Sequence, residues 1–282
     1  MPSGSAHAGS PRRVRYPQVG SGSVSDPLTV IARFPGVSEA VDEARDAVDR
    51  LYRHRVLRRA SPAVSAESSL RGARASAALE GVDVSLDALR RDEVRDPAVQ
   101  GALRASAELG RMGPTWRKAP RQVLARLHTV AAAGLASEAA LGRPRTFDTV
   151  PDPLGLGEAP GAGETARRME ALLGLLQRPS DAPAIVLAAV VHAELAVLRP
   201  FGTADGVVAR AAERLTLVEY GLDPKSLVAV EVGWLELPYG EGLRAYLSGT
   251  PEGVSQWVQH CASAVTLGAR ETTAICEAMR RG

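Results

Sequence analysis

This 282-residue sequence has few cysteines, few aromatic residues and a small net charge. Its two cysteines, Cys261 and Cys276, fall in one predicted C-terminal helical stretch, where a mutual disulfide would be geometrically awkward. A reducing, cytoplasmic compartment is therefore the default expectation. The formal net charge is only +2, so no overall field draws the protein to nucleic acid or to an anionic membrane. We expect neither as a partner.

Long hydrophobic runs are absent as well. The most apolar stretch, residues 185–198, is too short to span a bilayer and contains His192 and Glu194. The N-terminal residues have arginines but no apolar segment after them, which is not the pattern of a secretory signal. They are rich in Ser, Gly and Pro, so we expect a disordered lead over residues 1–37.

The rest of the chain favours helices. Hydrophobic residues make up 45% of the sequence and charged residues 23%, as in ordinary soluble globular proteins, while aromatic residues supply only 4%. Apolar residues recur at helical spacing from residue 38 onward. The pattern predicts an all-α, multi-helix domain over residues 38–282. Its first helix is expected over 38–59 and its second over 63–81, ending at Gly81, a residue typical of helix C-termini.

Residues 142–163 interrupt the helical pattern. Their density of Pro and Gly excludes a helix and predicts a long loop with a small flap or hairpin. Long loops in compact domains often carry function. We expect Asp148 and Asp152 to serve turns and caps, the commoner use of Asp in such loops, although either residue suits a metal. Arg143 and Arg145 are expected to face either a phosphate group or solvent.

Two separated segments carry recognisable motifs. Residues 76–81 have a Ser, three residues, a Glu and a Gly, and residues 192–224 include Pro200 and Phe201 between two helical patterns. The second segment aligns without gaps on the signature His-Pro-Phe, any residue, an acidic residue, Gly-Asn-Gly-Arg and a further Arg three positions later. Together they resemble the Fic (Fido-domain) family, in the class that carries its own inhibitory helix. The resemblance implies a Fic-like fold, with an inhibitory-type helix over 63–81 and a degenerate Fic loop over 199–210.

The resemblance also implies a phosphate-handling site. A loop that enters a helix N-terminus exposes backbone N–H groups that bind anionic oxygens. In the family, the histidine is the general base that deprotonates a target hydroxyl, the acidic residue holds Mg²⁺, and two arginines hold the polyphosphate of ATP. The outcome is transfer of AMP, or in relatives of another phosphate-containing group, onto a protein side chain. Fic proteins are often dimers, so a homodimer is expected by analogy.

This sequence departs from the signature where the chemistry takes place. Arg199 stands at the histidine position, and a guanidinium that stays protonated does not accept a proton. Thr203 replaces the acidic metal ligand and offers only a neutral oxygen to a cation that prefers carboxylate. Asp205 replaces the asparagine and suits either a metal or the cap of the following helix. Thr203 and Asp205 are the only metal candidates left in the loop.

Other parts of the motifs are kept. Gly206 and Arg210 survive from the signature and, with Asp205, are the residues expected to bind an anion or a nucleotide. Ser76 and Glu80 survive from the inhibitory motif. In the family the inhibitory glutamate pairs with the second arginine and excludes the productive nucleotide pose. Two interpretations stay open: the pair is a structural lock that has outlived the chemistry, or it gates a modified anion pocket in which Arg199 supplies positive charge.

Three functions are compatible with these residues. The leading hypothesis is a pseudoenzyme without standard protein AMPylation, which acts as a regulatory or binding module through a remnant phosphate or nucleotide pocket; its partner is then a nucleotide or a protein. The second is an enzyme with altered chemistry on a phosphate-bearing or other small substrate, in which Arg199 is an electrostatic stabiliser. The third is residual adenylyl transfer with ATP and Mg²⁺, against which the loss of three polar functions argues. His128 and His192 are expected to be packed core histidines.

Overall fold

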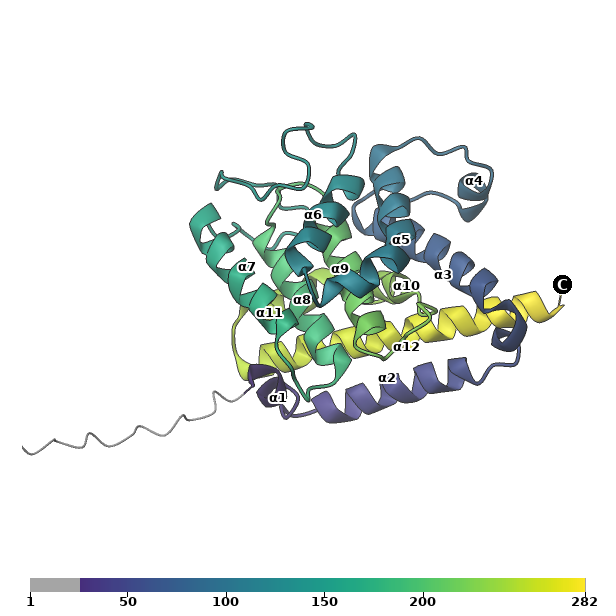
Figure 1. Cartoon of the computed structure of the whole chain (residues 1–282). Helices are drawn as coiled ribbons and strands as arrows, with labels where there is room; N and C mark the ends of the chain where they lie inside the picture. Colours follow the sequence, from purple (N-terminus) through teal and green to yellow (C-terminus); the bar gives the residue numbers. More distant parts are fainter. Residues whose placement is uncertain (1–25, 282) are drawn as a thin grey trace, which may run out of the picture.

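The computed structural model describes residues 26–281, and this part of the chain forms twelve helices (Figure 1). In chain order they are α1 (Pro27–Ile31), α2 (Val37–Tyr52), α3 (Leu57–Leu79), α4 (Leu86–Arg90), α5 (Pro97–Trp116), α6 (Pro120–Ala131), α7 (Ala162–Gln177), α8 (Ala184–Leu198), α9 (Asp205–Glu219), α10 (Val230–Leu235), α11 (Tyr239–Leu247) and α12 (Pro251–Arg281). No strand forms within residues 26–281, so the predicted all-α class is confirmed.

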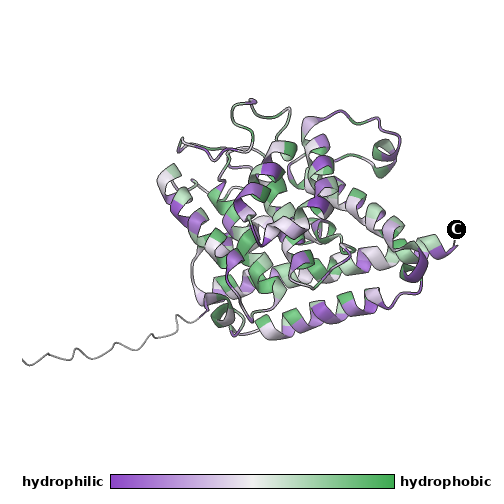
Figure 2. Cartoon of the chain, in the orientation of Figure 1, coloured by the Kyte–Doolittle hydropathy of each residue, from purple (hydrophilic) through white to green (hydrophobic). Residues whose placement is uncertain are grey.

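The helical hairpin of α8 and α9 lies at the centre of the molecule. In α8 every residue except Ala184 and Glu194 is buried, which explains why its sequence is apolar on all sides. Figure 2 shows green along much of the central helices, while the peripheral helix α2 alternates between green and purple. The turn of residues 199–204, which joins α8 to α9, therefore sits on a rigid base.

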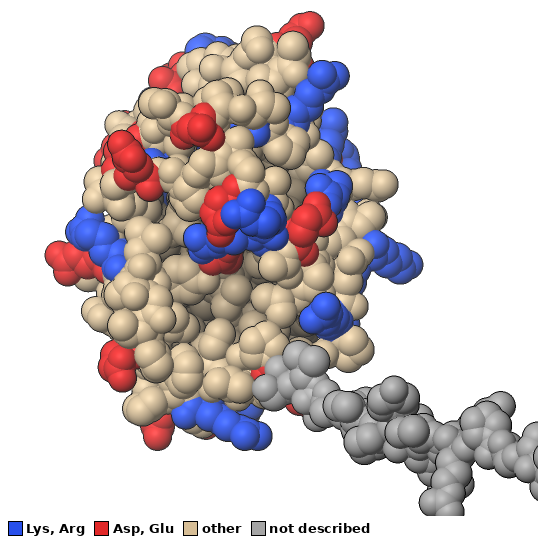
Figure 3. All heavy atoms as spheres, turned by 90° about the vertical axis from the view of Figure 1, so that its left-hand side faces the viewer, with Lys and Arg blue, Asp and Glu red and all other residues tan. Residues whose placement is uncertain are grey.

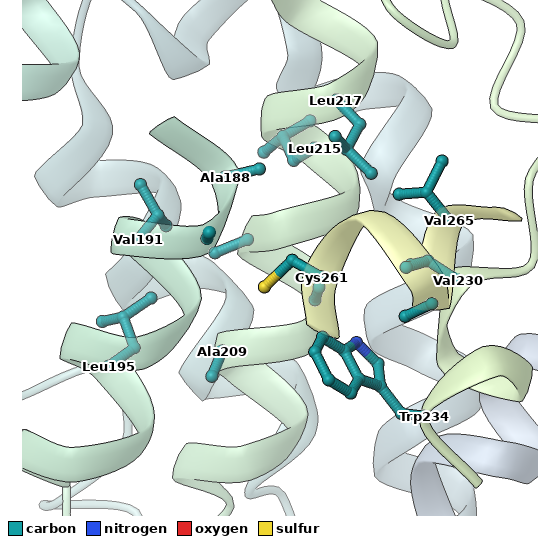
Figure 4. Packing of buried hydrophobic residues seen from close by; sticks show 14 of the residues in the cluster. Ala188, Val191, Leu195, Ala209, Leu215, Leu217, Val230, Trp234, Cys261 and Val265 are labelled. Carbon is teal, nitrogen blue, oxygen red and sulfur yellow. The ribbon is translucent and has the colours of Figure 1, made fainter. Parts of the chain in front are cut away.

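The core is built by side chains from α8, α9, α10 and α12. Val191, Ala209, Trp234 and Cys261, one from each of these helices, are all fully buried and lie close together in Figure 4. The long helix α12 also packs along α2 and α11. Small residues in this core let helices approach closely, which suits a sequence rich in alanine and poor in aromatic residues.

Several predicted boundaries differ from the observed ones. The described part begins at Asp26 rather than at residue 38, and it includes α1, whose Leu28 is buried. The rest of the expected lead, residues 1–25, lies outside the described residues. The first predicted helix ends earlier, at Tyr52, and the second starts earlier, at Leu57, because the chain turns between them. A kink at Ala60, two residues before Pro62, adds a short first turn to α3.

The long loop predicted over 142–163 is observed over residues 142–161, since α7 begins at Ala162, and of the expected flap or hairpin no hairpin forms. Its residues have no strand pairing, and the isolated bridge between Ala133 and Ala136 lies before it. Four prolines and several glycines in 142–161 remove backbone donors and the regular dihedral angles that a ladder requires. Among residues 26–281, no helix combines the length and the apolar character needed to cross a membrane.

Close helix packing gives a first prediction. A Cβ atom on Gly101 of α5 would overlap the backbone carbonyl oxygen of Ala131 in α6, whereas one on Gly110, in the same helix, would meet open space. We expect Gly101→Ala to lower the free energy of unfolding by about 1–3 kcal/mol. The matched Gly110→Ala should raise it by about 0.5–1 kcal/mol, because alanine is the better helix former. Urea unfolding of the two variants tests this, and equal effects would contradict the packing.

Candidate functional site

A cavity of about 230 Å³ lies where the C-terminal end of α3, the 199–204 turn, the start of α9 and the 142–161 loop meet. Its lining includes Arg199, Thr203, Asp205 and Gly206 from the α8–α9 segment and Glu80 from the end of α3. The structure therefore brings together most of the residues that the two sequence motifs single out. Asp152, Leu154 and Leu156 of the loop complete one wall.

The turn itself has an unusual backbone. Arg199 (φ 47°) and Ala204 (φ 54°) both adopt the left-handed conformation, as does Gly202 (φ 77°). A non-glycine residue in this conformation is strained by about 1–2 kcal/mol. Ala204 stands where the family signature has glycine, so the turn keeps a shape that suits glycine although the glycine is gone. Such strained turns concentrate at functional sites.

Arg199 lines the cavity, and its guanidinium is held by the long loop. Its guanidinium donates hydrogen bonds to the carbonyl oxygens of Pro151 (2.9 Å) and Gly157 (2.5 Å) and lies 3.3 Å from a carboxylate oxygen of Asp152. Its side chain is only 7% exposed. Asp152 accepts N–H bonds from Leu156 and Gly157, the turn duty expected of it. Arg199 thus closes the loop over the turn, which argues against its role as a replacement for lost positive charge.

Asp205 is buried and does not cap α9. Its carboxyl oxygen accepts the N–H of Phe201 at 2.9 Å, four residues earlier, so it stabilises the strained turn and not the helix end. Burial raises the pKa of Asp205 to about 7, and the nearby Glu80 carboxylate adds to the rise. A proton acceptor whose pKa lies near neutral pH therefore stands in the cavity.

These residues do not fit a magnesium ion. No group of three or more His, Cys, Asp or Glu side chains within residues 26–281 is arranged to hold a metal. Thr203 lines the cavity with a neutral oxygen, and the Asp205 carboxyl is buried against backbone N–H groups. Mg²⁺ prefers near-octahedral oxygen ligands with carboxylates free to coordinate it.

Glu80 and Arg210 form a close ion pair. The Glu80 carboxylate lies 2.6 Å from a terminal nitrogen of Arg210, whose Nε donates to the hydroxyl of Ser76 (2.9 Å) and whose Nη2 also donates to the Ser76 carbonyl (3.0 Å). The Arg210 side chain is fully buried, whereas that of Glu80 is 20% exposed. Glu80 therefore lies between the arginine and the cavity.

Gly206 lets this pair close. A Cβ atom at residue 206 would collide with the Glu80 carboxylate, so that carboxylate rests directly on the first turn of α9. The start of a helix attracts anions through its unpaired N–H groups and its dipole. The Glu80 carboxylate therefore lies where the start of α9 attracts negative charge.

A second buried arginine, which the sequence analysis did not single out, fastens α3 to α9. Arg214, one helical turn after Arg210, donates to the hydroxyls of Ser68 (3.2 Å) and Ser226 (3.0 Å) and pairs with Glu231 at 3.3 Å. A signal for it exists in the sequence. Positions 68, 72, 76 and 80 of α3 are Ser, Gly, Ser and Glu, a small or polar residue every four positions on the face that meets the two arginines.

A network of polar side chains in the core lies next to Arg210. Tyr239, whose ring centre lies 5.8 Å from the Arg210 guanidinium, shares a 2.7 Å hydrogen bond with His192. The other ring nitrogen of His192 lies 2.7 Å from Glu213, which also accepts the indole N–H of Trp234. The prediction that His192 is a hydrogen-bonded core histidine is confirmed.

Arg145 was expected to face phosphate or solvent, and it does neither. It is 6% exposed and donates to the carbonyl oxygens of Leu198, Arg199, Phe147 and Pro160. Its backbone N–H also bonds the carbonyl of Pro200. Arg145 thus links the long loop to the end of α8 and to the turn. The sequence offers no pattern that distinguishes it from the exposed Arg143.

Comparisons with known proteins support the fold. No model of a protein family matches the chain, and a search of curated proteins finds no match. A Fic family protein from Desulfovibrio desulfuricans has a similar structure, with a TM-score of 0.70 at 20% identity, over 86% of this chain and 75% of that one. Fic-1 from C. elegans gives 0.64 at 16% identity, over 90% and 75%. At such identities the likeness shows the fold, and the predicted Fic-like fold is confirmed.

The contacts of Arg199 give a second prediction. Arg199→Met removes the donors that hold Pro151 and Gly157, so the loop should open locally more often. We expect amide hydrogen exchange at Leu156 and Gly157 to become about tenfold faster or more, since hydrogen bonds to a charged donor are worth about 1.5–3 kcal/mol. Arg143→Met, which removes an exposed arginine from the same loop, is the control. Unchanged exchange in Arg199→Met would show that the loop is held by other contacts.

The carboxyl group of Asp205 gives a third prediction. Because its pKa is raised from 3.8 to about 7 on folding, the folded state keeps a proton that the unfolded state has lost between these values. The free energy of unfolding should therefore fall as the pH rises from about 4 to about 7. The variant Asp205→Asn, whose side chain can still accept the N–H of Phe201, should lack this decrease in the free energy of unfolding when urea unfolding is measured from pH 4 to pH 7.

The control is Asp42→Asn, which removes an exposed carboxylate on α2 and should keep the decrease. If both variants lack the decrease, the assignment to Asp205 is refuted.

Proposed function

We propose that this chain, which has the Fic fold, is a degenerate member of that fold class that does not carry out standard protein AMPylation and acts as a regulatory or binding module. One observation carries the proposal. Arg199 occupies the position of the catalytic histidine, stays protonated, and has its guanidinium bound to Pro151 and Gly157 of the loop. A target hydroxyl placed in this turn would find no proton acceptor at residue 199.

The ion pair of Glu80 and Arg210 supports a binding function that is closed in this state. Glu80 covers the first turn of α9 and shields Arg210, so an anion gains access only when the Glu80 side chain turns away. Residue 80 ends α3 and precedes Gly81, which has a φ of 91°. The glutamate can therefore move while α3 stays fastened by Arg214. The ligand class that suits the opened position is a phosphate or a nucleotide.

A second candidate function has one observation in its favour. Asp205 lies in the same cavity and has a pKa near 7, which is the range a general base needs. An enzyme with altered chemistry on a small or phosphate-bearing substrate would take its base from this residue. The carboxyl oxygen that bonds Phe201 also supports the turn, so catalysis would have to use the other oxygen.

A nucleotide or a protein is the expected partner, and nucleic acid is not. On the face drawn in Figure 3, basic side chains are spread over the surface, and several of them lie beside acidic ones. Together with a net charge of +2, this supports a partner recognised at a local site and not through a long-range field.

Labelled ATP tests whether transfer survives. The unaltered protein and Glu80→Gly are incubated with Mg²⁺ and ATP labelled at the α-phosphate, and incorporation is followed on a gel. We expect no label in either, because removing Glu80 opens the site without supplying a base. Incorporation by the unaltered protein that is lost in Arg199→Met would overturn the proposal.

Calorimetry with pyrophosphate tests the closed binding site. Glu80→Gly leaves Arg210 and the start of α9 free, so it should bind pyrophosphate about tenfold more tightly than the unaltered protein, or better. Glu80→Gly combined with Arg210→Met should lose this gain without leaving a buried charge unpaired. Asp83→Gly removes an exposed acid beside α3 and is the control for charge alone. Equal affinities in all four proteins would leave Glu80 and Arg210 as structure only.

A further inference from the structure

A second cavity, of about 320 Å³, lies between α6 and α7. It shares no lining residue with the cavity beside Glu80. Its volume falls within the range of small-molecule sites, about 300–1,000 Å³. The contacts between α6 and α7 are few, so the space between these helices is not filled by their own side chains. None of Glu80, Arg199, Asp205 and Arg210, on which the proposed function rests, lines it.

The walls of this cavity are largely carbon. They include Pro144 of the loop, Pro200 and Phe201 of the turn, and apolar side chains of the two helices, Leu124, Met169 and Leu173. Phe201 is itself held in place, because its ring stacks on the imidazole of His128 with 4.2 Å between the ring centres. Binding of an apolar ligand against such a wall is favourable, because it removes apolar surface from water.

The inner polar groups of the cavity are already paired. Arg145 donates to backbone carbonyls and to the hydroxyl of Thr165, and that hydroxyl donates to the carbonyl of Pro160. The charged pair of Arg121 and Glu170 also lines the cavity, but both side chains are more than half exposed, which places their charges toward the solvent. A ligand carrying a charge into the interior would lose its hydration and find no unpaired partner.

We propose that this cavity binds a small, uncharged and largely apolar molecule between α6 and α7. The ligand would touch Pro200 and Phe201, which directly follow Arg199 in the turn. This places an apolar site on one side of the same turn whose other residues line the cavity beside Glu80. The inference does not rest on the proposed function and holds whether or not any phosphate binds.

Indole, a neutral aromatic molecule, is the probe, and the methyl groups of methionine are the reporters. The chain has four methionines, of which Met169 lines the cavity and Met112 is buried in α5 away from it. Titration of methyl-labelled protein should shift the Met169 resonance in a saturable way and leave that of Met112 in place. Met169→Leu assigns the signal. Absence of a saturable shift at Met169 would overturn the proposal.

Two matched variants locate the site. Ala166 is an exposed alanine of α7 that lines the cavity, and Ala171 is an exposed alanine of the same helix that does not. Ala166→Phe should fill the cavity and weaken indole binding about tenfold or more, whereas Ala171→Phe should bind as the unaltered protein does. Thermal unfolding of both variants verifies that they fold. Equal indole affinity in Ala166→Phe and Ala171→Phe would place the indole elsewhere and overturn the assignment.

Indole-3-acetate, which adds a carboxylate, tests the ligand class. It should bind about tenfold more weakly than indole or worse, because its charge has no partner in the interior. Binding of indole-3-acetate as tight as that of indole, and lost in Ala166→Phe, would show that the cavity takes organic anions and would refute the uncharged class.

Discussion

The buried arginines of α9 determine how the site is built. Arg210 and Arg214 lie one turn apart on a helix that is almost entirely enclosed, and both reach across to the same face of α3. A guanidinium without partners in such surroundings would destabilise the fold by several kcal/mol, of the order measured when one partner of a buried pair is removed, about 3–5 kcal/mol. Ser68, Ser76 and Glu80 provide such partners, and Gly72 leaves room for the Arg214 guanidinium. Helix α3 is therefore an integral part of the core, and the backbone at its C-terminal end is fixed beside α9.

Two further arginines fix the long loop in an analogous way, mainly through backbone carbonyl oxygens, and Arg199 also lies beside the Asp152 carboxylate. Arg145 links the loop and α7 to the backbone of the turn, and Arg199 links the turn back to the loop. Loops of this length usually owe their order to packing of their own side chains or to a bound ligand. Here the backbone oxygens of a segment that has no regular structure are satisfied by two nearly buried cations, and the cavity wall beside Glu80 depends on that arrangement.

The sequence predicts the fold well because the fold depends on helical periodicity and on two motifs with many constrained positions. It also predicts that Glu80 and Arg210 belong to one site, because each lies in a motif of the Fic resemblance and the corresponding glutamate and arginine pair in that family. The sequence does not predict the structural roles of Arg145, Arg199 and Asp205, because these roles depend on the tertiary surroundings of each side chain. An arginine in a Pro-rich loop gives no sign that backbone carbonyls will surround it, and an aspartate at a helix start suggests a cap until the preceding turn is seen to bend back toward it. Burial and pairing arise from tertiary contacts that no local pattern encodes.

The loop contacts of Arg199 also bear on how this protein can evolve. A histidine at residue 199 would place an imidazole at the signature position, yet it would remove the donors that now hold Pro151 and Gly157. Such a substitution would therefore loosen the loop, whatever it did for proton transfer. Arginine at residue 199 is thus a structural requirement of the loop, and selection for an ordered loop would oppose its exchange for a proton acceptor.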